Sequence, residues 1–211
     1  MNLHEWEPRF AAYVAERSGD AAHDVEHVRR VVANAKRLAA AERAPLDVVI
    51  PAAWLHDVVH VPKDSPDRAR ASRLAADAAA RQLAAWGYPS ALVPEIAHAI
   101  EAHSFTAGIA PRTPAARVVQ DADRLDALGA VGLARTLMLG GAMGRLLYDA
   151  ADPFCERRAP DDRASTIDHF YTKLLHLPGR MQTPSGRAEA ARRADVLRGF
   201  LDALRRELDA A

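Results

Sequence analysis

Apolar residues recur at spacings of three and four positions along most of the chain, a pattern typical of amphipathic helices. Alanine, leucine, arginine and glutamate dominate these segments, while glycine and proline stand mainly between them. No stretch of useful length alternates apolar and polar residues, as a half-buried strand would. The pattern therefore predicts an all-α fold.

The predicted helices follow one another with short breaks. The first five cover residues 3–17, 23–43, 46–60, 67–87 and a segment that Ser90 caps at its start. A sixth opens at Thr113, with a proline at its first position, and two more cover 167–175 and 183–208. Gly140, Gly141 and Gly144 predict a flexible break, and residues 151–162 an ordered loop or short linker.

The charge balance bears on which partners the protein can bind, and the single cysteine bears on the compartment in which it works. Lysine plus arginine equals aspartate plus glutamate at 28 each, so no net charge indicates a nucleic acid or an anionic membrane as partner. The N-terminus has no apolar signal-peptide core, and no window has the length and hydropathy of a transmembrane helix. With Cys155 as the only cysteine, we expect a cytoplasmic protein.

Polar residues stand at inward-facing positions of three separate predicted helices. His56 and Asp57 interrupt the apolar segment AAWLHDVVH, His27 lies four residues before Val31, and Asp123 lies four residues after Val119. A buried charge must be paired or must bind a metal. Imidazole and carboxylate together suit Mn, Fe, Co, Ni or Zn, and carboxylates also hold Mg. These residues are therefore candidate metal ligands.

Each of these positions also has a structural interpretation. A single histidine on an apolar face is usually a hydrogen-bonded core residue, and a neighbouring aspartate can pair with it without a metal. Asp121 and Asp126 are better placed to support the site or face the substrate. His98 and His103 are five residues apart, which is about 140° around an α-helix, so they would not normally bind one ion side by side. The sequence favours one metal.

The three motifs in order resemble the HD superfamily of metal-dependent phosphohydrolases. The resemblance rests on HDVEHVRRV, LHDVV and DADRLDALGA, and HDVVHVPKDSPDRARAS, HSFTAG and IDHFYTKLL extend it to a bacterial subfamily of stand-alone hydrolases. It implies a single HD-type helical bundle with additional C-terminal helices over residues 1–211. The metal-site core would cover about 20–130 and the C-terminal helical extension about 160–211. It also implies the metal ligands His27, His56, Asp57 and Asp123.

The implied activity is hydrolysis of nucleotides, with nucleoside or deoxynucleoside triphosphates as substrates and phosphate or pyrophosphate as product. One divalent ion, with Mn or Mg favoured for activity and Co, Ni, Fe or Zn as alternatives, would activate water and polarise phosphorus. Asp57 and Asp123 would orient that water, and His60 is a candidate general acid or base, or a hydrogen-bond donor to phosphate. The candidates for binding phosphate or substrate are Lys63, Arg30, Arg124 and His103, with Arg68 and Lys173 as weaker ones.

The sequence is also compatible with other functions. LHDVV and ADRL are also similar to hydrolases that remove pyrophosphate from guanosine tetraphosphate, but those continue the doublet with an acidic pair where this chain has His60 and Val61. A di-iron oxygenase would need additional ligands such as His98 and His103. A non-catalytic helical sensor module would not need the buried polar set. We expect a small-molecule nucleotide as partner, no nucleic acid or membrane, and a homodimer as one open oligomeric state.

Overall fold

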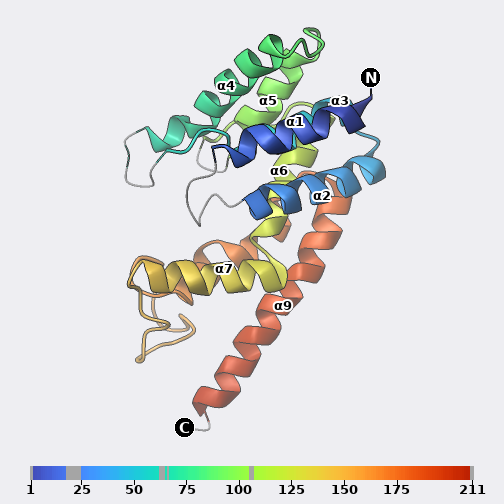
Figure 1. Cartoon of the computed structure of the whole chain (residues 1–211). Coiled ribbons are helices and arrows are strands. Elements are labelled where there is room, and N and C mark those ends of the chain that lie inside the picture. Colours follow the sequence, from blue (N-terminus) through green and yellow to red (C-terminus); the bar gives the residue numbers. More distant parts are fainter. Residues whose placement is uncertain (1, 18–24, 62–64, 66, 105–106, 210–211) are drawn as a thin grey trace. The chain divides into compact units, whose positions relative to one another are not determined.

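The computed structural model describes residues 2–17, 25–61, 65, 67–104 and 107–209 (Figure 1). Within them the regular structure is helical, apart from one isolated parallel bridge between Leu146 and Ser165, which confirms the all-α prediction. The helices are α1 (Leu3–Ala15), α2 (Val25–Glu42), α3 (Leu46–Leu55), α4 (Ala71–Ala85), α5 (Val93–His103), α6 (Pro114–Asp126), α7 (Gly129–Ala142), α8 (Asp168–Thr172) and α9 (Pro184–Asp209). Short 3₁₀ turns are η1 (Arg68–Arg70), η2 (Leu174–His176) and η3 (Pro178–Arg180).

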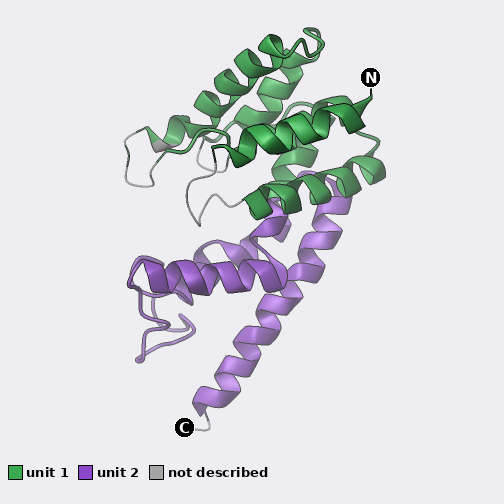
Figure 2. Ribbon diagram, viewed as in Figure 1, with its two compact units in different colours: residues 1–123 green, residues 124–211 purple. Residues whose placement is uncertain are grey.

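The chain divides into two compact units, residues 1–123 and residues 124–211, and the boundary falls within α6 (Figure 2). The predicted single domain over residues 1–211 stays a prediction. No single helix among the described residues is long and apolar enough to cross a membrane. The helices α6 and α7 reach that length and hydropathy only when they are taken together across the break between them.

The first unit is built around α3, which is buried along its whole length after its first two residues. Helices α1, α2 and α5 each pack against α3, and α4 lies alongside α5 (Figure 1). Phe10, Leu83 and Ile100 are among the side chains of this core with no exposed surface. Burial of such side chains, at about 1.5–3 kcal/mol each, is the main stabilisation of this unit. The inward-facing stripes that the sequence predicted thus surround α3.

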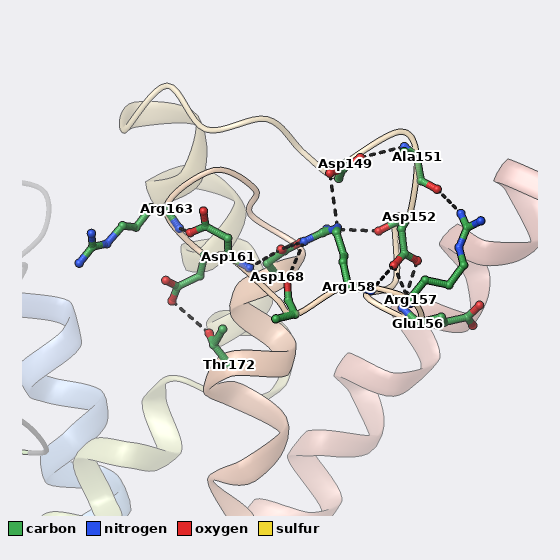
Figure 3. A network of polar contacts seen from close by, with 12 residues as sticks. Asp149, Ala151, Asp152, Glu156, Arg157, Arg158, Asp161, Arg163, Asp168 and Thr172 are labelled. Carbon is green, nitrogen blue, oxygen red and sulfur yellow. Dashed lines mark hydrogen bonds and ion pairs between the residues drawn. The ribbon is translucent and has the colours of Figure 1, made fainter.

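The second unit packs α7 and the 3₁₀ turns η2 and η3 against the long helix α9. Leu197 and Ala194 of α9 and Phe170 of α8 have no exposed surface. The segment between α7 and α8, residues 149–168, is ordered by side chains that accept backbone hydrogen bonds, as Figure 3 shows. The prediction of an ordered loop in this region is confirmed.

Among the helix boundaries that differ from the predicted ones, two have a local explanation. The helix predicted over 46–60 ends at Leu55, and Val58 already donates a turn-type hydrogen bond to the Leu55 carbonyl. β-branched residues at 58, 59 and 61 and a proline at 62 disfavour its continuation. Ser90 is not a helix cap, because α5 begins at Val93 with the proline at 94 in its first turn. Thr113 does cap α6, since its Oγ1 accepts a hydrogen bond from the Ala116 amide.

The predicted flexible break at 140–144 is wrong at its first two glycines. Gly140 and Gly141 lie inside α7, and only Gly144 adopts a positive φ, of 68°, just after the helix. Gly140 is needed for packing: a Cβ at this position would lie 2.1 Å from Oγ1 of Thr166, whereas a Cβ at Gly141 would meet nothing within 4 Å. Glycine at 140 thus reflects a close approach of the 166 segment rather than a hinge.

We expect Gly140→Ala and Gly141→Ala to change stability in opposite directions. The first forces buried Thr166 to move and should cost about 1–3 kcal/mol. The second should stabilise by up to about 1 kcal/mol, because alanine has the better helix propensity and the site has room. Urea unfolding followed by circular dichroism measures both. Equal effects of the two substitutions would contradict the packing role of Gly140.

Candidate metal centre

His56 and Asp57 lie where α3 ends, which explains how two adjacent residues can both face one site. The His56 ring is fully buried, and its Nδ1 lies 2.8 Å from the Ala53 carbonyl one turn earlier. Because a carbonyl oxygen only accepts, Nδ1 carries the proton and Nε2 presents its lone pair. That Nε2 has no hydrogen-bond partner and lies 3.6 Å from Oδ2 of Asp57. The helix end turns the Asp57 carboxylate toward the same point as the His56 ring.

Asp123 and His27 complete the set that the sequence predicted. Oδ1 of Asp123 lies 3.5 Å from Nε2 of His27 and 3.8 Å from Nε2 of His56. His27 is buried near the start of α2, and Asp123 is on the last turns of α6. One ligand atom from each of His27, His56 and Asp57 lies within 4.8 Å of the others. Residues that are distant in sequence thus converge within the first unit.

His103 belongs to the same cluster. It is the last residue of α5, its Nδ1 lies 2.6 Å from the Ile100 carbonyl, and its Nε2 lies 3.5 Å from Oδ1 of Asp57. The His103 and His56 rings are 4.9 Å apart between centroids. The sequence analysis predicted that His103 contacts the substrate or supports the metal ligands. Its contact with Asp57 is compatible with either role.

The donor set fits a divalent cation. Nε2 of His56 faces carboxylate oxygens of Asp57 and Asp123 at 3.6 and 3.8 Å, which is too long for a hydrogen bond. Two lone pairs facing each other across such gaps repel unless a proton or a cation lies between them. A buried Nε2 without a partner, next to two carboxylates, is what a bound ion would satisfy. The group of His27, His56 and Asp57 can therefore hold a metal ion, which agrees with the expected cofactor class.

The electrostatics favour the protonation states that bind metal. Burial lowers the pKa of His56 despite the nearby carboxylates, so the ring stays neutral at pH 7. Burial opposes ionisation of Asp123, but contact with His27 and interaction with the neighbouring His56 and His103 rings, which are protonated in acid, lower the pKa of Asp123 to about 2. Burial likewise opposes ionisation of Asp57, and His56 and His103 hold its pKa well below the usual value. Neutral imidazole and ionised carboxylate are the ligand forms.

Among the remaining predicted residues, Lys63 lies outside the residues that the structure describes. His60 is exposed beyond the end of α3, so it is not one helical turn from His56 on a common face, as the longer predicted helix implied. Arg124 donates from Nη1 to the Arg180 carbonyl at 2.6 Å, and Arg30 is half-buried on α2. His98 lies elsewhere, with Nε2 accepting from the Arg112 amide at 3.0 Å.

Comparison with known proteins agrees with this geometry. Residues 24–128 match the family described as HD domain. The protein YpgQ of Bacillus subtilis is 34% identical to this chain over 190 residues, which cover 88% of this chain and 84% of YpgQ. The chain belongs to the HD superfamily. The resemblance of its H, HD and D motifs to this superfamily is thereby confirmed.

Solved structures show the same fold along the whole HD-superfamily chain. The crystal structure of B. subtilis YpgQ in complex with ADP aligns with a TM-score of 0.77 and 31% identity, over 98% of this chain and 97% of that one. An HD-superfamily hydrolase from Bacillus thuringiensis aligns with a TM-score of 0.77 and 30% identity, over 100% of both chains. These relatives support the interpretation that this HD-superfamily protein is a hydrolase.

Two buried amides, which the sequence did not single out, hold the backbone next to the cluster of this HD-superfamily protein. Asn34 of α2 donates to the Ala122 carbonyl at 3.4 Å, one residue before Asp123. Gln120 of α6 donates to the Ala102 carbonyl at 2.5 Å, one residue before His103. Ala102 is in the last turn of α5, where carbonyls have no helical donor. The sequence signal that could have identified these two amides is a polar residue at an inward-facing position of a helix.

Replacing Gln120 by leucine should therefore destabilise the first unit. The change removes the donor to the buried Ala102 carbonyl, and an unsatisfied buried acceptor costs about 1–3 kcal/mol. Urea unfolding measures the loss of stability. The control is Gln82→Leu, at a half-buried position of α4, where we expect the free energy of unfolding to change by less than about 0.5 kcal/mol. Equal stabilities of Gln120→Leu and the parent would show that this hydrogen bond contributes nothing.

The depressed pKa of Asp123 predicts an acid-dependent contribution to stability. The folded pKa of about 2 lies below the value of about 3.9 expected in the unfolded chain. The ionised carboxylate therefore contributes stability above about pH 4, on the order of 2 kcal/mol, and the contribution disappears as pH falls through the folded pKa. Urea unfolding of metal-free protein from pH 6 to 2 should show the difference between parent and Asp123→Asn shrinking. A difference independent of pH would contradict the assignment.

Proposed function

We propose that this chain is a metal-dependent phosphohydrolase that acts on nucleotides, with nucleoside or deoxynucleoside triphosphates as the substrate class and phosphate or pyrophosphate as product. The observation that carries the proposal is the convergence of His27, His56, Asp57 and Asp123, with a buried and unpartnered Nε2 on His56. Membership of the HD superfamily supports hydrolysis. The ADP complex of YpgQ supports a nucleotide as the ligand.

The proposed ligands of the metal are His27, His56, Asp57 and Asp123, and one divalent ion, Mn or Mg for activity, fits two imidazoles and two carboxylates. Such an ion lowers the pKa of bound water and polarises a phosphoryl group. Asp57 and Asp123 remain ionised at neutral pH and can accept a hydrogen bond from the attacking water. Asp57 is the better candidate for orienting that water, because about a third of its side chain is exposed.

The proposed substrate contacts come from residues around this cluster. His103 is positioned by the Ile100 carbonyl and by Asp57, and the contact with Asp57 raises its pKa against the effect of burial. A histidine in that state can donate a hydrogen bond to a phosphate oxygen. Lys63 and Arg30 remain candidates for phosphate binding, and His60 for proton transfer. Arg124 is a weaker candidate, since its Nη1 already donates to a carbonyl.

The proposal is tested by assaying purified protein, with its bound metal quantified, against a substrate panel. The panel contains ribo- and deoxynucleoside mono-, di- and triphosphates, cyclic dinucleotides and guanosine tetraphosphate. We expect Mn- or Mg-stimulated hydrolysis of triphosphates, and separate detection of phosphate and pyrophosphate identifies the bond that is cleaved. Two irons per chain with no hydrolysis would favour a di-iron oxygenase, and no activity on any nucleotide with full metal loading would reject the proposal.

A further inference from the structure

A second cluster of ionisable side chains lies in the second unit, and none of its residues belongs to the proposed ligand set. His169 of α8 places its Nδ1 2.7 Å from Oδ2 of Asp162, and the Thr172 hydroxyl donates to the same oxygen at 3.0 Å. Because the carboxylate only accepts, the ring proton sits on Nδ1 and the other nitrogen, Nε2, remains available for a ligand. Asp162 thus fixes the orientation of a partly exposed histidine, whose side chain is 24% exposed.

Two cations flank this histidine. Lys173 follows His169 by one helical turn, and its amide donates to the His169 carbonyl at 3.1 Å. Arg145 is placed by the bridge between Leu146 and Ser165, in which the Leu146 amide donates to Ala164 and the Leu146 carbonyl accepts from Thr166. Burial lowers the pKa of His169, and the charges of Lys173 and Arg145 lower it further against Asp162. Both cations therefore act on the same ring.

Among the described residues, the single carboxylate of this cluster offsets only one of its two cations. Arg145 and Lys173 are half-buried, and neither forms an ion pair or a side-chain hydrogen bond with any residue that the structure describes. The one carboxylate of the cluster, on Asp162, is already shared by His169 and Thr172. Neighbouring Asp168 is engaged by the Arg158 guanidinium and the Asp161 amide. Two half-buried cations beside an oriented imidazole form an environment that favours an anion.

We propose that Arg145, His169 and Lys173 bind a diphosphate group, either free pyrophosphate or the phosphate chain of a nucleotide. Arginine and lysine supply charged donors, and Nε2 of His169 supplies a third donor once the bound anion favours the imidazolium. The choice of diphosphate over other anions rests on the proposed function, since nucleotide phosphates and pyrophosphate are the substrate and product classes there. Orthophosphate has fewer oxygens to reach three donors and should bind more weakly.

The test measures binding to the full chain without turnover. Metal is removed with a chelator and dialysed away, so that binding through a metal at Asp57 and Asp123 does not contribute. Pyrophosphate, orthophosphate, ADP and adenosine are then titrated by calorimetry, and the His169 ring is followed by nitrogen-15 NMR. We expect saturable binding of pyrophosphate and of ADP, a shift of the His169 ring signals with an increase in its pKa, and no binding of adenosine.

Matched substitutions identify the residues. Arg145→Gln and Lys173→Gln should each weaken pyrophosphate binding at least about tenfold, because each removes a charged donor. Arg163→Gln is the control from the same loop: Arg163 is exposed, and its side chain points away from the network around Asp168 in Figure 3. Circular dichroism of each variant verifies folding, and His169→Gln provides an independent third variant.

Any of these results would overturn the proposal: no saturable binding of pyrophosphate, unchanged binding in both Arg145→Gln and Lys173→Gln, or equal weakening in Arg163→Gln. Binding of adenosine with the affinity of ADP would assign the contact to the base or sugar and would also reject a diphosphate site. These outcomes are separate from failure of the proposed function. The proposed hydrolysis depends on the metal ligands of the first unit and is measured with metal present, whereas this test has neither metal nor turnover.

Discussion

Replacing either His56 or Asp57 by alanine should reduce metal-stimulated nucleotide hydrolysis by about a thousandfold or more. Loss of partners that merely orient metal ligands typically costs about 10–100-fold, so loss of a proposed ligand itself should cost more. Each substitution removes a ligand atom from the group that lies within 4.8 Å. The bound metal per chain, measured by mass spectrometry, should fall in parallel with the rate. Activity is measured as release of phosphate and pyrophosphate from the best substrate of the panel.

The matched control for these variants is His98→Ala. His98 is on the same helix as His103, but it accepts a hydrogen bond from the Arg112 amide and does not join the cluster. Its removal should leave metal content unchanged and activity within about twofold of the parent. Full activity and full metal content in both His56→Ala and Asp57→Ala would show that the proposed centre is not the catalytic one.

Replacing Arg158 by methionine should cost the second unit about 3–5 kcal/mol, because it leaves a buried carboxylate without its cation. Asp168 has no exposed surface, and its oxygens accept from both terminal nitrogens of Arg158 and from the Asp161 amide (Figure 3). Burial alone would raise the pKa of Asp168, but Arg158 holds it below the usual value. Without Arg158 the carboxylate must either stay charged in the interior or take up a proton.

Urea unfolding measures this loss against two reference variants. Arg198→Met breaks the exposed pair with Asp195 and should change stability by less than about 0.5 kcal/mol. Arg158→Met combined with Asp168→Leu should recover part of the loss, because an apolar pair leaves no buried charge. Recovery should be incomplete, since the Asp161 amide then loses its acceptor. If Arg158→Met cost no more than Arg198→Met, the buried pair would not be a stabilising feature of this loop.

The sequence alone determined the helical class and the ligand candidates. Apolar spacing of three and four residues needs only local geometry, and it placed His27, His56 and Asp123 on inward faces correctly because an inward face repeats with the helix. The motif HD identified Asp57 although α3 ends before it. The membership in the HD superfamily was likewise readable from three short motifs in order.

Only the tertiary structure decided what depends on distant contacts. The sequence predicted a flexible break at Gly140 because glycine has an unusually free backbone. In the fold this glycine instead allows the close approach of Thr166, which no local sequence pattern encodes. Sequence spacing indicated only that His98 and His103 do not share one face, whereas the fold shows that Nε2 of His103 lies next to Asp57. The same is true of His169, whose orientation by Asp162 depends on how the 149–168 segment returns to α8. Sequence periodicity predicts which face of a helix a residue occupies. Which helix faces contact each other depends on tertiary packing.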